Sequence, residues 1–275
     1  MQMPKRLRKD RLIRQLMEET DNNNLLNLLE KETFCFSCHK DISCFTECCA
    51  KLHLVLTPYD ILRIKIRLGL KSQDFLSRHT YTRPMYHKIF PAVLLKMDKE
   101  KGDRCPFVTK EGCNIYEDRP GACRIYPLAR ASKAMVGSNR GATSSKEKFF
   151  IVSESHCLGF QEKRSWSLAE WLDHEGVSTY NNMNDKWLEI IAQSLPMGTK
   201  EELTRKLQMF FMASYNLDRF RDFIFDSNFL NVFQLPAQVR KDIKNDDTSL
   251  MMFAFDWLKF SLFGDKSSGL IIQQS

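Results

Sequence analysis

The stretch FCFSCHKDISCFTECC, residues 34–49, carries the first group of cysteines in this chain. Its spacing is Cys35-x2-Cys38-x5-Cys44-x3-Cys48-Cys49. Thiols so close in sequence can be presented by one loop to one metal centre, as in structural zinc sites and iron–sulfur sites. This stretch therefore predicts an irregular segment pinned by metal.

A second group follows in CPFVTKEGCNIYEDRPGAC, residues 105–123, with the spacing Cys105-x7-Cys113-x9-Cys123, and Cys157 comes later. Glycines and prolines within this stretch prevent it from forming one long element. Distant cysteines of this kind can close a site from the other side. All nine cysteines lie between residues 35 and 157, and residues 158–275 contain none. This crowding favours metal binding over scattered core cysteines.

The first residues of the chain indicate in which cellular compartment the protein is expected. Met1–Arg14, MQMPKRLRKDRLIR, has basic charges but no apolar run of the kind that a secretory signal contains. We therefore predict a cytoplasmic protein whose thiols stay reduced. The apolar run Phe90–Leu95 is far too short to cross a bilayer, so no membrane span is predicted.

The net charge of +7 is concentrated near the N-terminus. Such a basic segment can bind nucleic acid or an acidic membrane surface. No aromatic side chains interleave with these charges, as stacking on bases would require. We therefore favour a solvated helix face there and do not favour nucleic acid as a partner.

The rest of the chain shows mainly helical patterns. Thr57 and Pro58 are typical of a helix start, and Ser167 with Glu170 and Thr199 with Glu202 form capping boxes. The predicted fold class is mainly α with minor β. Three segments are predicted: a basic N-terminal helix at residues 1–33, a cysteine-cluster metal-binding domain at residues 34–160, and a helical domain at residues 161–275.

The spacing of the cysteines does not name the metal. It matches neither the paired Cys-x2-Cys of a zinc ribbon nor the cysteine run of a bacterial ferredoxin. Four thiolates around zinc or a four-iron cluster leave a net charge of about −2, which requires nearby donors or cations. Four arginines near the second cysteine group could compensate this negative charge, or could serve only to keep the surface soluble. They are Arg104, Arg119, Arg124 and Arg130.

Other site chemistry is less well supported by the sequence. His39 and His53 flank the first group and could replace a thiolate, although a lone histidine is more often a surface residue. His156 beside Cys157 could be the base of a cysteine nucleophile, but neighbours in sequence rarely form such a pair. Asp60 could act in acid–base chemistry and is explained equally well by helix capping.

Several motifs together resemble a known family. They are Cys38-x5-Cys44-x3-Cys48-Cys49 followed by LTPYDI (56–61), then CPF (105–107), CNIYEDRP (113–120) and CRIYPL (123–128). In this order they resemble the YkgJ-type cysteine-cluster family, a zinc- or iron-chelating domain, over residues 34–160. The family's first block is tighter than here, and Cys35 lies outside the pattern. The ligands that this resemblance implies are Cys38, Cys44, Cys48, Cys49, Cys105, Cys113, Cys123 and Cys157.

The resemblance also implies candidate cofactors and activities. Eight thiolates could hold one cluster or two four-coordinate centres, with an iron–sulfur cluster of the [4Fe–4S] type expected and zinc as the alternative. The flagellin lysine-N-methylase group is similar, so the enzymatic alternatives are an oxidoreductase and a protein N-methyltransferase. No Gly-x-Gly-x-x-Gly motif indicates a donor site. A zinc-stabilised interaction module remains the non-enzymatic alternative, and the partner is an unidentified protein or redox partner.

Overall fold

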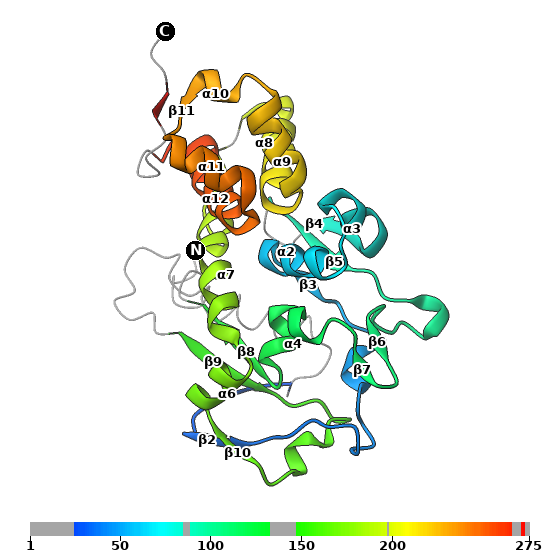
Figure 1. Ribbon diagram of the computed structural model, residues 1–275. Helices are drawn as coiled ribbons and strands as arrows, with labels where there is room; N and C mark the ends of the chain where they lie inside the picture. Colours follow the sequence, from blue (N-terminus) through cyan, green and yellow to red (C-terminus); the bar gives the residue numbers. More distant parts are fainter. Residues whose placement is uncertain (1–24, 85–88, 133–146, 197, 266–270, 273–275) are drawn as a thin grey trace, which may run out of the picture.

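The computed structural model describes residues 25–84, 89–132, 147–196, 198–265 and 271–272 (Figure 1). Most of the predicted N-terminal helix, residues 1–33, lies outside the described residues. The described end of that segment contains strand β1 (Leu26–Leu28).

Short antiparallel strands make up several small sheets in the described part of the chain. One three-stranded sheet has the order β1-β9-β8, and a second has the order β3-β5-β4. Three two-stranded pairs, β10-β2, β6-β7 and β11-β12, complete the set. The strands after β1 are β2 (Thr33–Cys35), β3 (Val55–Leu56), β4 (Thr80–Pro84), β5 (Pro91–Leu95), β6 (Val108–Thr109), β7 (Gly112–Cys113), β8 (Leu128–Ala131), β9 (Lys148–Val152), β10 (Ser165–Ser167), β11 (Phe233–Gln234) and β12 (Ile271–Ile272).

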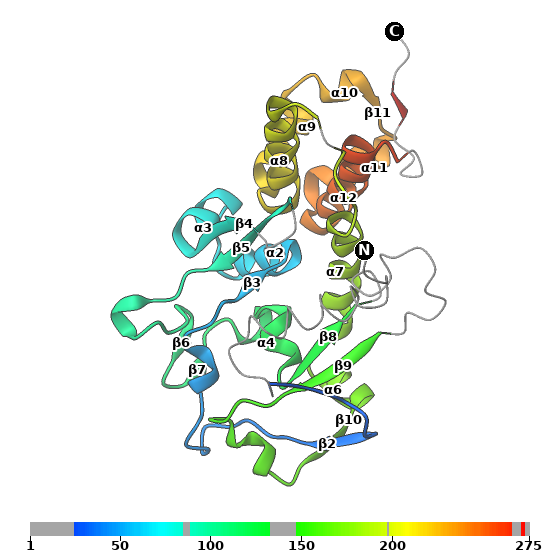
Figure 2. The ribbon, with the colours of Figure 1, turned by 180° about the vertical axis from the view of Figure 1, so that it is seen from behind.

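The helices divide into two groups (Figures 1 and 2). Of the helices within the described ranges, three lie among the cysteine-bearing segments, and the others follow the last cysteine. No helix in the described residues combines the length and the apolar character needed to cross a membrane. The helices are α2 (Pro58–Arg67), α3 (Ser72–His79), α4 (Gly121–Ile125), α6 (Leu168–His174), α7 (Val177–Ile191), α8 (Lys200–Tyr215), α9 (Leu217–Asp226), α10 (Phe229–Val232), α11 (Ala237–Asn245) and α12 (Asp247–Phe263).

The prediction of a mainly α fold is wrong. The structure contains 51% helix and 18% strand, so it is a mixed α/β fold. Each strand has only two to five residues, which is too short for the alternation of apolar and polar residues to stand out. In addition, β1 pairs with β9 and β2 with β10, so the partners are distant in sequence.

The helix starts follow from local sequence. The hydroxyl of Thr57 accepts a hydrogen bond from the Asp60 amide, and the Asp60 carboxylate accepts one from the Thr57 amide, which makes the capping box of α2. The predicted boxes of Ser167 with Glu170 and Thr199 with Glu202 are likewise present at α6 and α8. The capping predictions are confirmed.

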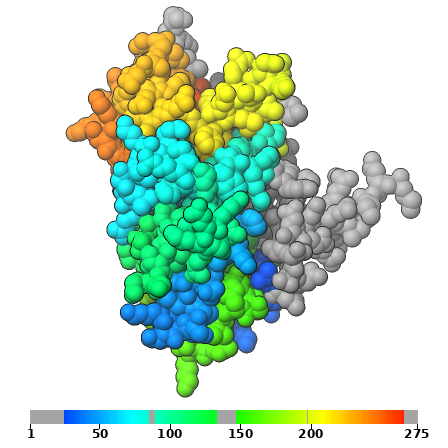
Figure 3. Space-filling view, turned by 90° about the vertical axis from the view of Figure 1, so that its right-hand side faces the viewer, coloured from blue at the N-terminus to red at the C-terminus, as the bar shows by residue number. Residues whose placement is uncertain are grey.

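Two apolar cores hold the described residues together. The first joins side chains from α2, α3 and β5 to side chains from α7, α8, α9 and α12. The second is smaller and joins Phe34 and Phe36 to Ile125, Trp166 and Trp171. Figure 3 shows α2 and α3, in cyan, between the yellow helices α8 and α9 and the green and blue cysteine-bearing segments. Both cores therefore contain residues from either side of residue 161, and the division into domains at 34–160 and 161–275 stays a prediction.

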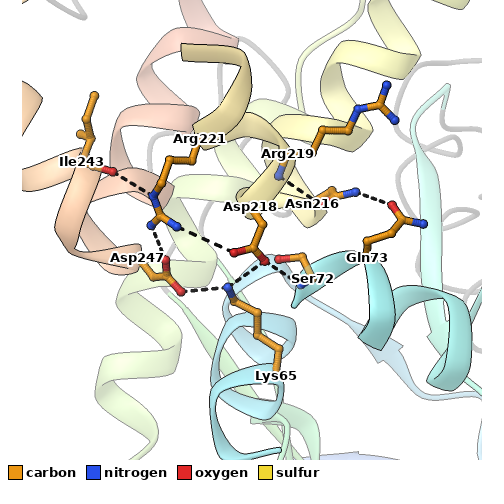
Figure 4. A network of polar contacts seen from close by, with 9 residues as sticks. All are labelled: Lys65, Ser72, Gln73, Asn216, Asp218, Arg219, Arg221, Ile243 and Asp247. Carbon is orange, nitrogen blue, oxygen red and sulfur yellow. Dashed lines mark hydrogen bonds and ion pairs between the residues drawn. The ribbon is translucent and has the colours of Figure 1, made fainter. Parts of the chain in front are cut away.

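A buried ion network ties α2 to the helices that follow the last cysteine (Figure 4). The Lys65 ammonium of α2 is 3.1 Å from Asp218 of α9 and 2.9 Å from Asp247 of α12. Asp218 also accepts a hydrogen bond from the Ser72 amide at the start of α3, at 2.6 Å. Arg221 binds Asp247 from the other side. Lys65 is only 4% exposed, so its charge depends on these carboxylates.

We expect Lys65→Met to lower the free energy of unfolding by about 3 kcal/mol, because it leaves Asp218 and Asp247 without their shared buried cation. Chemical denaturation followed by circular dichroism measures this loss. Lys259→Met is the matched control. It removes an ion pair with the exposed Glu189 and should cost at most about 1 kcal/mol. Equal losses in the two variants would contradict the importance of the network.

Candidate metal centre

Four of the predicted ligands surround one small pocket. The side chains of Cys38, Cys44, Cys48 and Cys157 line it, and we call them the pocket set. The remaining lining residues are Phe36, Ile42, Tyr126, His156 and Gly159. Burial, followed by the negative charges of the other three thiolates of the set, raises the pKa of Cys38 to about 11. The structure thus brings together cysteines that are more than 100 residues apart in sequence.

Local contacts explain how Cys157 reaches the first cysteine group. The Ser37 amide donates a hydrogen bond to the Gly159 carbonyl at 3.1 Å, which draws the two segments together. A Cβ atom at residue 159 would lie 2.6 Å from the Phe36 ring, so only glycine permits this approach. The Leu158 amide also donates to the Cys44 sulfur at 3.3 Å. That bond aligns Cys44 beside Cys157.

Three further cysteines, Cys105, Cys113 and Cys123, pack against the first core, and we call them the core set. Burial raises the pKa of Cys123, and the charges of Cys105 and Cys113 add to this effect. The charge of Cys48 raises the pKa of each member of the core set as well. Cys48 therefore lies next to both sets.

Backbone amides point at the core-set sulfurs. Burial raises the pKa of Cys105, and hydrogen bonds from the Phe107 and Val108 amides oppose this rise. A hydrogen bond from the Ile115 amide acts in the same way on the pKa of Cys113. Amide donors of this kind stabilise a sulfur that carries negative charge, as a metal-bound thiolate does. The segment that leads into β6 and the strand β7 thus each carry one thiol with donors already in place.

Cys48 and Cys49 connect the two sets. Both belong to one turn of 3-10 helix, residues Glu47–Cys49, and a hydrogen bond between their side chains is the largest cause that raises the pKa of Cys48. The Cys49 carbonyl accepts a hydrogen bond from the Cys105 amide at 2.7 Å, so this turn is joined directly to the core set. Arg104 fixes the same turn by donating to the Thr46 carbonyl and hydroxyl at 2.9 and 2.8 Å.

The arginines proposed as compensating cations have different surroundings. Arg119 is 7% exposed, stacks on Tyr116 and forms a buried ion pair with Glu175. Its charge lowers the pKa of Cys113, although burial raises that pKa overall. Arg124 donates to the carbonyls of Glu175 and Glu117 at 2.5 Å, which links α4 to the end of α6.

Arg130 has a different set of contacts, with the carboxylates of Glu147 and Asp185. Arg104 lies 3.5 Å from Glu47 in addition to its contacts with Thr46. Among the four arginines, the electrostatic influence of Arg119 on a cysteine therefore gives the clearest support for a role in charge compensation.

Asp60 has a second role that capping does not explain. Its Oδ2 accepts from the Thr57 amide, while its Oδ1 accepts from the Gly121 amide at 2.8 Å, two residues before Cys123. Burial raises the pKa of Asp60, and these hydrogen bonds oppose the rise. A Cβ at residue 121 would touch Tyr180 at 3.4 Å, which leaves little space between α4 and α7. Asp60 therefore holds the helix that carries Cys123.

The other candidate residues lie at the margin. Cys35 is exposed in β2, opposite Ser165. His39 is 3.6 Å from both Asp41 and Glu162. His156 lines the pocket and is 3.6 Å from Glu154. Sequence reasoning did not identify Tyr126 as a pocket residue, although Tyr126 lies within the motif that carries the family resemblance.

The side chains as placed do not enclose an ion. In the part of the chain that the structure describes, no three His, Cys, Asp or Glu side chains are arranged to hold one metal ion. The chemistry of the donors nevertheless fits metal: thiols with amide donors gather around one pocket and one adjoining turn, and soft thiolates suit zinc and iron–sulfur clusters. The residues named above would hold the group, and their placement defines no coordination geometry.

The comparison with protein families agrees with this site. Residues 37–158 match the CxxCxxCC family, described as a "putative zinc- or iron-chelating domain". The matched segment contains all eight predicted ligands and excludes Cys35. No curated protein and no solved structure matches the chain. The resemblance predicted from the sequence is confirmed for this segment, and it supports metal binding.

We expect Asp60→Ala to lower the free energy of unfolding of the metal-free protein by about 3 kcal/mol, because the amides of Thr57 and Gly121 lose a buried charged acceptor. Denaturant titration of the reduced protein measures this change. Glu170→Ala is the control, since Glu170 caps α6 through Ser167 but joins no second helix. Its loss should be clearly smaller, and a loss as large as that of Asp60→Ala would refute the linking role.

Proposed function

We propose that this protein binds an iron–sulfur cluster through Cys38, Cys44, Cys48 and Cys157, which all lie in the segment that matches the family described as a "putative zinc- or iron-chelating domain". The observation that carries the proposal is the gathering of these four thiols around one pocket. Four cysteine thiolates are the usual ligands of [2Fe–2S] and [4Fe–4S] clusters. Such a cluster would supply one-electron redox chemistry when bound, which supports a redox role with an electron-transfer partner in the cytoplasm.

The apolar part of the pocket lining also supports a cluster. Apolar side chains from Phe36 and Ile42 complete the lining. An apolar lining limits the access of water to a cluster and thereby influences its reduction potential.

We also propose that Cys49 joins Cys105, Cys113 and Cys123 in a second centre. The link is the hydrogen bond from the Cys105 amide to the Cys49 carbonyl, which places the 3-10 turn against the core set. Cys49 is the cysteine of the matched segment that belongs to neither set, so it completes four ligands for the second centre. The buried Arg119 supports this centre because its charge lowers the pKa of Cys113.

The test is to purify the full chain without oxygen and to measure its visible spectrum, iron, acid-labile sulfide and zinc on one sample. We expect a brown protein with equal amounts of iron and sulfide, whose absorption bleaches with dithionite. A colourless protein that contains zinc would refute the cluster and would leave the cysteines as structural ligands.

A pair of matched cysteine variants tests the ligand assignment. We expect Cys48→Ser to lose most of the bound iron and sulfide, because Cys48 lines the pocket and lies beside both sets. Cys35→Ser should keep the wild-type content, since Cys35 is exposed and outside the matched segment. Retention of the full iron content in Cys48→Ser would show that the pocket set is not the ligand set.

A further inference from the structure

A row of buried polar atoms follows one face of α7. Tyr180, Asn184 and Trp187 occupy positions i, i+4 and i+7 of this helix, so their side chains share that face. Within the described residues, the Tyr180 hydroxyl, the Asn184 amide oxygen and the Trp187 indole nitrogen are shielded from solvent and have no hydrogen-bond partner. Since nearly all buried polar groups in proteins are hydrogen-bonded, these atoms point to a bound partner.

Two more atoms of this kind face the row from neighbouring elements. The ring of Tyr215, at the end of α8, lies 6.1 Å from that of Trp187, and its hydroxyl has no partner in the described part of the chain. The Arg124 guanidinium of α4 lies over the face of the Tyr180 ring, 4.8 Å from its centroid. Its terminal nitrogens donate to two backbone carbonyls, while its buried Nε finds no acceptor among the described residues. We call these five side chains the α7 polar seam.

The carboxylate of Asp60 lies beside the seam. A Cβ at residue 121 would lie 3.4 Å from the Tyr180 ring, 3.5 Å from the Asn184 amide nitrogen and 3.6 Å from Asp60 Oδ1, so these three side chains surround Gly121. The oxygens of Asp60 accept from the amides of Thr57 and Gly121. A carboxylate that is 2% exposed is stabilised by further polar groups close to it.

The chemistry of the five atoms selects the ligand. The indole and guanidinium nitrogens can only donate, the amide oxygen can only accept, and the two hydroxyls can do both. A metal cation cannot accept from the donors, and an anion such as chloride cannot donate to the Asn184 oxygen. Water does both, and a buried water typically makes about three hydrogen bonds to otherwise unsatisfied groups.

We propose that ordered water molecules bind in the α7 polar seam and hydrogen-bond to the hydroxyls of Tyr180 and Tyr215. Helix α7 is then joined to α4 and to the end of α8 partly through water. This inference does not depend on which metal the cysteines hold, because the seam contains no cysteine.

Deletion of a hydroxyl distinguishes a hydroxyl bonded to water from an unbonded one by the sign of its effect. If water binds the hydroxyl, exchange of tyrosine for phenylalanine removes a hydrogen bond and leaves the water with one partner fewer, so the fold is destabilised. If the hydroxyl has no partner, the same exchange removes a desolvated polar group and stabilises the fold.

The experiment compares the full wild-type chain with Tyr180→Phe and Tyr215→Phe. We expect a lower midpoint of urea denaturation in both variants, followed by circular dichroism. We also expect fewer long-lived internal waters in both folded variants, counted by oxygen-17 magnetic relaxation dispersion. Tyr81→Phe is the control, since it removes a half-exposed hydroxyl in β4, and its midpoint and water count should equal those of the wild type.

A midpoint equal to or above that of the wild type in either Tyr180→Phe or Tyr215→Phe would overturn the inference. An unchanged number of long-lived waters in these variants would overturn it as well. The assay of iron and sulfide is separate from both measurements, so failure of this inference and failure of the proposed cluster are distinguishable.

Discussion

The buried carboxylate of Asp60 is the interaction on which the arrangement of the cysteine-bearing segments depends. One of its oxygens closes the first turn of α2, and the other accepts from the first residue of α4. Side chains of α2 are buried in the first core, so the hydrogen bond from the Gly121 amide to Asp60 holds α4, and with it Cys123, in a fixed position relative to that core. A carboxylate that is 2% exposed can persist only while its acceptor sites are filled, so the two helix starts and the charge stabilise one another.

The two cores give the two cysteine sets different supports. The core set packs against the larger core, which includes α7, α8, α9 and α12, whereas Cys157 packs against the smaller one around Trp166 and Trp171. The Arg119–Glu175 ion pair acts on one cysteine of each set, since Arg119 lowers the pKa of Cys113 and Glu175 raises the pKa of Cys38. The helices after residue 161 therefore help to hold the cysteines in place. The ion pairs of Lys65 with Asp218 and Asp247 join the same helices to α2.

Some of this could be predicted from the sequence and some could not. Capping residues act within one helical turn, so Thr57, Ser167 and Thr199 were recognisable from their neighbours alone. The ligand candidates were recognisable because cysteine spacing and the family motif are local patterns. The fold class was wrong because strands of two to five residues obtain their stability from distant partners. The hydrogen bond from Gly121 to Asp60 and the place of Tyr126 in the pocket depend on tertiary packing, which no local pattern reports.

The succession of Cys48 and Cys49 has a consequence for how the protein acquires its metal. The two residues share one short 3-10 turn, and that turn is tied by Arg104 and by the Cys105 amide. In the proposed arrangement of two centres, ordering of this turn around one metal group also places the cysteine that serves the other centre. The conformational entropy of the turn is then lost only once, although two proposed centres benefit from the ordered turn. We expect loading to be cooperative, with partly filled molecules scarce at every metal concentration.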